Sequence, residues 1–273
     1  MKENTQKKSK KKPVLIVLGV ILALIVCMVI VLAVNASKNM KAMHATIGQG
    51  MDAVRAHYTV TPVDAGEYAD LTMYGLMKFH TDQYRVENLG NLSVMTTNMG
   101  MMQMVSFMIT PFEKNVPVCT LDFMYIMGNR KSYVEFYDLV GDLQTEEYAA
   151  VIAALQEMQG RYADVPDVEV SEAWYDSYLT VVMHKSLTAK EEERNTALFC
   201  DALQTYLDAS AALPQSSPED AAAQLANTEA YSNGLIEKGG VSTNVFKKAL
   251  GEETTRDFFN QTFFGTDNYR SAE

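Results

Sequence analysis

An uninterrupted apolar segment near the N-terminus constrains this chain more than any other feature of its sequence. The segment from Val14 to Val34 contains 21 residues and no charged side chain. At about 1.5 Å rise per residue, a helix of this length spans roughly the 30 Å hydrocarbon core of a bilayer. A core helix of a soluble domain would be shorter or would carry a polar stripe. The segment therefore predicts a transmembrane helix at residues 13–35.

Two other interpretations of this segment stay open. A cleaved signal peptide has an apolar stretch of about 7–15 residues before a small-residue cleavage site. The stretch here is longer, and Val34-Asn35-Ala36 is a poor cleavage site. A lipoprotein signal would need a small residue before Cys27, where Val26 stands. An uncleaved helix that anchors the chain in the lipid bilayer is favoured over both.

The charges on either side of the segment predict its orientation. Five lysines lie between residues 7 and 12, whereas Lys38 and Lys41 follow the segment. Positive flanks remain in the cytoplasm, so we expect a cytoplasmic tail at residues 1–12 and an extracytoplasmic location for the rest. After Asn35 the chain has 17 basic and 33 acidic residues, a formal net charge of −16. Such an acidic domain repels phosphate backbones, so no nucleic-acid partner is expected.

The remainder divides into a stalk and one globular domain. Residues 39–57 predict a helix leading out of the membrane, and the segment 59–66, which contains proline and glycine, marks a boundary. We expect a helical stalk and linker at residues 36–65 and a globular domain at 66–273. Cys119 and Cys200 lie far apart and form no disulfide framework; two buried thiols are favoured over a pair.

The globular part changes character along its length. Between residues 71 and 140, short β-branched and aromatic runs alternate with turns such as Gly128-Asn129, which predicts an antiparallel meander. Several runs are apolar on both faces, so the sheet should be covered on both sides. After residue 142 helical patterns follow: one run begins at Thr145, a capping box starts at Thr188, and Ser217 is the N-cap of a third run. Strands followed by helices predict an α+β fold.

The most distinctive motif lies in the predicted sheet. Residues 111–125 read PFEKNVPVCTLDFMY, and after a turn at Gly128 comes Val134-Glu-Phe-Tyr-Asp138-Leu. This motif resembles the ferredoxin-dependent bilin reductases and the related red chlorophyll catabolite reductases. Residues 233–265 resemble the C-terminal helices of that family, and the resemblance covers about residues 66–266. It implies an α/β/α sandwich with a tetrapyrrole pocket between the sheet and the C-terminal helices.

The resemblance also implies site residues. Asp122 matches the family's proton-donating aspartate, which needs the raised pKa that a mostly apolar pocket supplies; a structural aspartate beside a turn or a basic group is the other interpretation. The family carries a histidine on the preceding strand, but residues 104–110 contain none, and His80 is the nearest candidate. Asp138 of the Asp-Leu pair and Lys247, as a partner for ligand carboxylates, are further candidates.

Methionines between residues 95 and 108 form a second candidate surface. Met102, Met104 and Met108 share one face of a predicted strand, where thioethers either fill a core or form an adaptable wall for a flat ligand. Met102 and Met104 are therefore candidate ligand-binding residues. The four histidines of the chain show no metal-ligand spacing, so no metal site is expected.

Three functions remain open for the domain. It could bind a tetrapyrrole or a similar flat hydrophobic ligand, with no other cofactor expected. It could instead be an interaction domain of a cell-envelope assembly without small-molecule chemistry, or an oxidoreductase acting on a linear tetrapyrrole. An acidic ferredoxin would be repelled by an acidic domain and is not expected outside the cytoplasm, so ferredoxin is not predicted as a partner.

Overall fold

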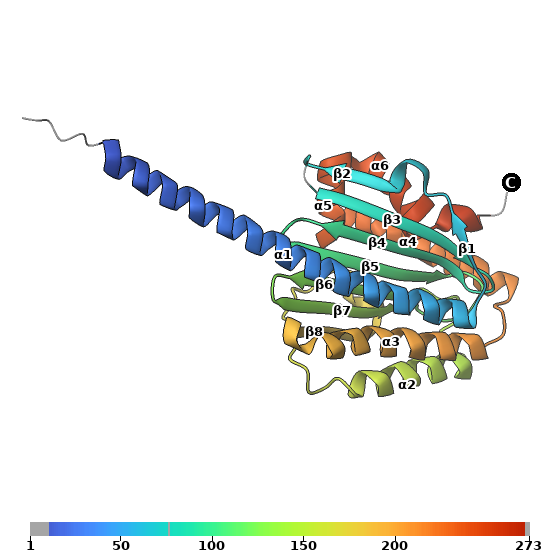
Figure 1. Ribbon diagram of the computed structural model, residues 1–273. Helices are drawn as coiled ribbons and strands as arrows, with labels where there is room; N and C mark the ends of the chain where they lie inside the picture. Colours follow the sequence, from blue (N-terminus) through green and yellow to red (C-terminus); the bar gives the residue numbers. More distant parts are fainter. Residues whose placement is uncertain (1–10, 76, 271–273) are drawn as a thin grey trace, which may run out of the picture.

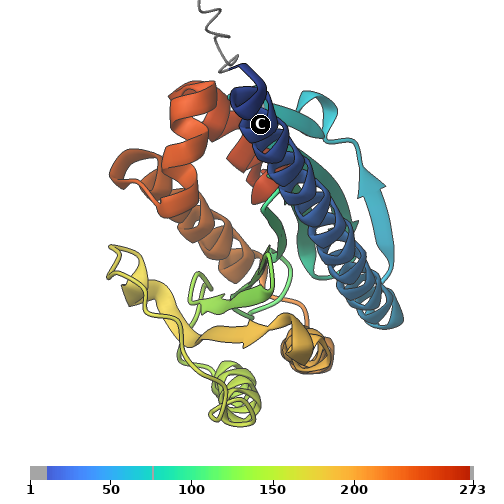
Figure 2. The same ribbon diagram turned by 60° about the vertical axis from the view of Figure 1, so that its left-hand side comes forward.

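The computed structural model describes residues 11–75 and 77–270 (Figure 1). Its centre is an eight-stranded antiparallel sheet in the order β1-β3-β4-β5-β6-β7-β8, with β2 paired to β3. Helices cover both faces of this sheet, as the rotated view also shows (Figure 2). The predicted α+β sandwich is therefore confirmed. Most of the expected basic tail, residues 1–10, lies outside the described residues.

The meander predicted between residues 71 and 140 accounts for most of the sheet, and β8 extends it. β8 pairs with β7 at one edge, although the sequence after residue 142 was expected to be helical. The segment 179–188 contains β-branched residues typical of a strand. The strands are β1 (Val60–Val63), β2 (Asp70–Met73), β3 (Met77–Val86), β4 (Gly90–Asn98), β5 (Met102–Pro111), β6 (Val118–Ile126), β7 (Asn129–Tyr137) and β8 (Leu179–Thr188).

The predicted helix starts form as expected. The side chain of Thr145 accepts a hydrogen bond from the N–H of Tyr148, and Thr188 forms a capping box with Glu191. The helices are α1 (Lys11–His57), α2 (Glu146–Gly160), α3 (Glu192–Ala212), α4 (Pro218–Lys238), α5 (Val241–Leu250) and α6 (Glu252–Phe258), which continues as a π-helical turn (Phe259–Phe263).

Helix α1 joins the apolar segment to the domain without a break. Its first half projects from the molecule with exposed apolar side chains, whereas its second half lies across the sheet beside α3 (Figure 1). Met43, Met51 and Val54 recur at helical spacing and are buried in the core. The structure thus differs from the expected domain boundary at residue 66, because residues 39–57 are a core element and not a separate stalk.

The face of the sheet beneath α1, α2 and α3 is densely filled. Phe199 of α3 packs edge-on against Phe107 and Phe123, with ring centroids 5.4 and 5.3 Å apart. Helix α1 approaches so closely that a Cβ atom on Gly50 would lie 2.7 Å from the ring of Phe199. Cys119 is buried on this face; it and Cys200 are free thiols.

Candidate functional site

The opposite face of the sheet encloses a cavity of about 490 Å³ beneath the C-terminal helices. Side chains of β5, β6 and β7 form its floor, including Met104, Met108 and Met124. This volume lies within the range of roughly 300–1,000 Å³ found for small-molecule sites. Aromatic side chains of α4, α5, α6 and the segment after α6 form the opposite wall: Tyr231, Phe246, Phe258, Phe259, Phe263 and Phe264.

A strip of polar side chains crosses the floor of this cavity. Strand pairing sets Asp122 of β6 opposite Ser106 of β5 and opposite Tyr133 of β7, and Tyr133 lies opposite His184 of β8. Paired residues on neighbouring strands project to the same face of the sheet. Four consecutive strands therefore each place a polar group in one row within otherwise apolar surroundings.

Asp122 is the strongest candidate for chemistry in this row. Its Oδ1 atom is buried and has no hydrogen-bond partner in the described structure. Burial is the main cause that raises the pKa of Asp122 to about 7; a hydrogen bond with Ser106 lowers this pKa, and the charge of Glu135 raises it. Near neutral pH this carboxyl group exists in both forms, so it can donate or accept a proton.

Glu135 and His184 form a second titratable unit on the floor. Nε2 of His184 lies 2.6 Å from Oε1 of Glu135, and the hydroxyl of Tyr137 donates to Oε2. Burial, with the neighbouring Tyr231 and Glu135, raises the pKa of Tyr137 well above its ordinary value. This pair was not predicted, because His184 lies on β8, which the local sequence pattern does not indicate. Period-two alternation along β7 could have placed Glu135 on the face of Asp122.

Two of the predicted site residues, Asp122 and Met104, line the cavity. Met102 lies on the same strand but is not among the lining residues. His80 lies on β3 next to Phe79, whose side chain packs on the cavity side of the sheet. Successive side chains point to opposite faces, so His80 projects away from the cavity.

His80, Asp138 and Lys247 each have polar partners away from the cavity. Nδ1 of His80 lies 2.8 Å from Oδ1 of Asp70, a hydrogen bond that raises the pKa of the histidine. Asp138 follows β7 and accepts a hydrogen bond from the hydroxyl of Tyr148. Lys247 donates to the carbonyl of Ile236 and pairs with Glu252 at 3.5 Å. The structure does not bring these three predicted residues to the cavity.

Comparison with known proteins supports the fold assignment. No family model matches this sequence, and no curated protein matches it. The structure is similar to the crystal structure of selenomethionine phytochromobilin synthase from tomato in complex with biliverdin, with a TM-score of 0.68 and 14% sequence identity. The match covers 83% of this chain and 84% of that chain. The fold is that of a bilin reductase. The resemblance inferred from residues 111–138 is thus confirmed at the level of fold.

Within this bilin-reductase fold, the cavity of the present chain is rich in hydrogen-bond acceptors. Its lining contains the carboxyl groups of Asp122, Glu135 and Asp176, and among the described residues that line it there is no lysine or arginine. Carboxylate oxygens favour N–H donors of a ligand, whereas a carboxylate of a ligand would find no lysine or arginine among the described lining residues, and His184 is already paired with Glu135. Over residues 11–75 and 77–270, no three His, Cys, Asp or Glu side chains cluster as a metal site.

Proposed function

We propose that this chain is a single-pass membrane protein whose extracytoplasmic domain binds a tetrapyrrole, or a similar large flat ligand, in the cavity above β5–β8. One observation carries the proposal: an aromatic-walled cavity in a bilin-reductase fold holds Asp122, which has a buried oxygen without a partner. Buried polar atoms of folded proteins are nearly always hydrogen-bonded. A ligand that donates a hydrogen bond to Asp122 would satisfy this atom.

The cavity supports a specific orientation of such a ligand. Its flat apolar surface would lie between the methionines of the floor, including Met104, and the phenylalanines of the opposite wall. Pyrrole N–H groups would point at Asp122 and Glu135, the carboxyl groups of the floor. Acidic substituents of the ligand would remain in solvent, because burying a carboxylate without a cation is costly. Biliverdin, the ligand of the tomato enzyme with this fold, has the size and the N–H groups required.

Membrane anchoring is supported by α1. The side chains of residues 16–31 are exposed, and the helix is long and apolar enough to cross a bilayer. The lysines before this segment favour a cytoplasmic N-terminus. A reporter that is active only in the cytoplasm, fused after Glu273, should therefore be inactive. An active reporter would reverse the proposed orientation.

Ligand binding can be tested on the full chain in lipid nanodiscs. Titration with biliverdin and with haem should change the visible spectrum of at least one of them. Asp122→Asn should weaken binding, because one of the two acceptor oxygens of the carboxylate is replaced by an NH2 group, which donates hydrogen bonds. Asp82→Asn, a strand aspartate that is exposed and outside the cavity, should leave binding unchanged. No spectral change with either tetrapyrrole would refute the proposal.

A second candidate function is the reduction of a linear tetrapyrrole. The observation that favours it is the pKa of about 7 at Asp122, which suits a proton donor near neutral pH. The electrons would have to come from a donor other than ferredoxin, because an acidic protein is repelled by a domain with net charge −16. Bound biliverdin should then be consumed when a chemical reductant is added. Binding without turnover, in both the natural chain and Asp122→Asn, would leave a binding protein.

A further inference from the structure

The domain begins very close to the end of the apolar segment. Val34 is the last residue of that segment, and Asn39 is the first buried residue after it within α1, which is unbroken between them. Five residues of helix rise about 7.5 Å. The headgroup layer on each side of a bilayer core is roughly 5–8 Å thick. If α1 spans a membrane, the domain must therefore start at the level of the lipid headgroups.

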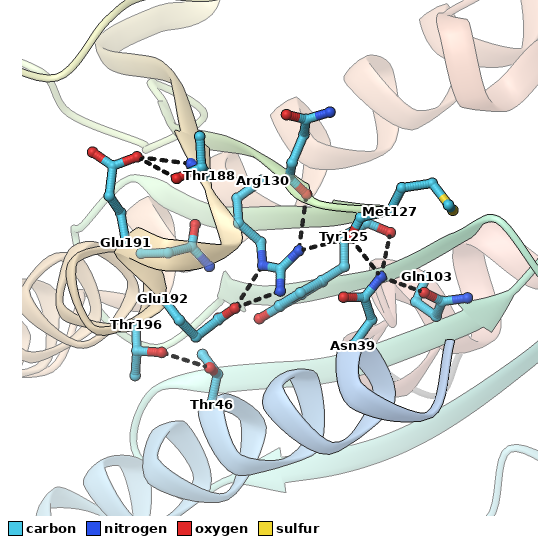
Figure 3. Close-up of polar contacts among 12 residues, drawn as sticks. Asn39, Thr46, Gln103, Tyr125, Met127, Arg130, Thr188, Glu191, Glu192 and Thr196 are labelled. Atoms are coloured by element: carbon cyan, nitrogen blue, oxygen red, sulfur yellow. Dashed lines mark hydrogen bonds and ion pairs between the residues drawn. The ribbon is translucent and has the colours of Figure 1, made fainter. Parts of the chain in front are cut away.

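The same region of α1 is clamped to the sheet (Figure 3). Nδ2 of Asn39 donates to Oε1 of Gln103 at 2.9 Å and lies 3.3 Å from the carbonyl oxygen of Met127. Farther along the helix, the hydroxyls of Thr46 and Thr196 are 3.2 Å apart. These contacts attach α1 to β5, to the turn between β6 and β7, and to α3. The domain is consequently held in one orientation relative to the emerging helix.

A buried arginine connects the β6–β7 turn to α3. The side chain of Arg130 is 4% exposed, and it pairs with Oε2 of Glu192 on α3 at 2.6 Å. Its guanidinium also donates to the carbonyl oxygen of Met127 and lies 4.7 Å from the ring centre of Tyr125 (Figure 3). The turn that receives Asn39 is thereby attached to α3 as well.

Exposed apolar side chains lie on the turns at this end of the sheet. Antiparallel pairing places the β2–β3, β4–β5 and β6–β7 turns at the same end. Tyr74, in the first turn, is 52% exposed, and Met101, in the second, is 56% exposed. The N–H of Met127 donates to the carbonyl oxygen of Met101 at 3.2 Å, which places Met101 two hydrogen bonds from Asn39.

The charges near this end differ from those of the domain as a whole. Lys38 and Lys41 of α1, Lys78 at the start of β3 and Lys190 before α3 are exposed here, and they outnumber the exposed Glu191 and Glu193 at the same end. The rest of the chain after Asn35 is strongly acidic. Lysines beside a membrane surface are attracted to the headgroups of anionic lipids. This composition suits a lipid surface: the turns expose a tyrosine and a methionine, and lysines lie beside them.

We propose that this end of the domain, the hairpin edge formed by the turns at Tyr74, Met101 and Met127, lies in the headgroup layer of the bilayer that holds α1. This inference rests on the proposed anchor. Met101, in the β4–β5 turn, lies two residues before Gln103, the residue that Asn39 contacts, which is a rise of about 7 Å along a strand. The edge also brings the cavity near the lipid, since Met104 lies only three residues from Met101.

The depth of individual side chains in the bilayer tests this proposal. Tyr74→Trp and Met101→Trp would be introduced separately into the full chain and reconstituted in vesicles of phosphatidylcholine and phosphatidylglycerol, with or without lipids brominated near the headgroup. Trp174, the single natural tryptophan, provides the same background in every variant. Leu143→Trp is the matched control, because Leu143 is an exposed apolar residue in the loop after β7, at the opposite end of the sheet. Leu22→Trp, near the middle of the apolar segment, reports on the anchor itself in parallel vesicles whose lipids are brominated near the ends of the acyl chains.

Brominated lipids should quench the fluorescence of both hairpin-edge tryptophans. The emission of these tryptophans should also lie at shorter wavelength in vesicles, because their surroundings are less polar. Leu143→Trp should be quenched no more than the natural chain. Quenching of Leu22→Trp without quenching of either hairpin-edge variant would overturn the docked edge and leave the anchor intact. Equal quenching of Leu143→Trp would also overturn it, since no defined end would then face the lipid. A lack of quenching at Leu22→Trp would reject the anchor, and the docked edge with it.

Discussion

The two faces of the sheet use the same strands for different purposes. On the face covered by α1, α2 and α3, aromatic rings pack edge-on and Gly50 permits contact between helices without a gap. On the other face, the helices after residue 217 leave a cavity of about 490 Å³ in which Asp122 has an unpaired oxygen. Because side chains alternate along a strand, stability and binding can be assigned to different residues of one strand.

Removal of α1 should break the filled face entirely. A chain that starts at residue 60 lacks Met43, Met51 and Val54, each of which contributes about 1.5–3 kcal/mol when fully buried. Their loss approaches the whole free energy of unfolding of a typical domain, about 5–15 kcal/mol. We expect cooperative thermal unfolding, followed by circular dichroism, for a chain that starts at residue 36 and not for one that starts at residue 60. Equal melting temperatures for the two chains would show that the domain is stable without α1.

Substitution of a single phenylalanine on each face should distinguish the contribution of that face to stability from its contribution to binding. Phe199→Ala, on the filled face, is expected to lower the free energy of unfolding by about 3–5 kcal/mol and to leave the biliverdin affinity of the folded protein unchanged. Phe263→Ala, at the partly buried cavity wall, should cost less stability and weaken biliverdin binding. Urea denaturation and visible titration measure the two effects. Similar stability losses for both variants would contradict the distinction between the faces.

The pH dependence of the free energy of unfolding should show the raised pKa of Asp122. Its folded-state pKa of about 7 exceeds the ordinary value of 3.8, so the folded protein holds this proton more tightly than the unfolded chain does. The resulting stabilisation is complete below pH 3.8 and is lost as pH rises through 7. Asp122→Asn should therefore gain stability relative to the natural chain as pH rises from 4 to 8, by about 3–5 kcal/mol for a shift of this size. Glu157→Gln, which removes an exposed carboxyl group of α2, should not show this pH-dependent difference.

Two glycines of α1 offer a smaller test of the filled face. Gly50→Ala should destabilise the protein by about 1–2 kcal/mol, because the new Cβ would overlap the ring of Phe199. Gly48→Ala meets no atom within 4 Å and should stabilise the helix by roughly 0.5–1 kcal/mol. The two changes in melting temperature should have opposite signs. A higher melting temperature for Gly50→Ala would show that α1 and α3 are not in close contact at this position.

Local sequence patterns accounted for the elements that are stabilised locally. The meander follows from short β-branched runs and turns, and the start of α2 follows from the hydrogen bond of Thr145 within its own first turn. Strand β8 was missed because an edge strand is stabilised by its pairing with β7, which no local pattern contains. The dual role of α1 was missed for a similar reason: the spacing of Met43, Met51 and Val54 predicts an apolar stripe without indicating what covers it.

The candidate site likewise contains residues that a local sequence pattern predicts and residues that only strand pairing brings together. Asp122 was predicted from a motif within one segment, and the pairing of β5 with β6 and β7 placed it at the centre of the cavity. His184 lies 49 residues from Glu135, and only the register of β7 and β8 brings them into contact. His80 and Lys247 have suitable chemistry but project elsewhere, because the pleat of β3 and the contacts of α5 determine their directions.

The sequence by itself determined the apolar helix, the alternation along the strands and the order of strands before helices, since each depends on the polarity and conformational preferences of neighbouring residues. Only the tertiary structure decided which face of the sheet was filled and which stayed hollow. That outcome depends on how helices from distant parts of the chain meet one sheet: α1 and α3 pack closely at Gly50, whereas the C-terminal helices leave open space above Asp122.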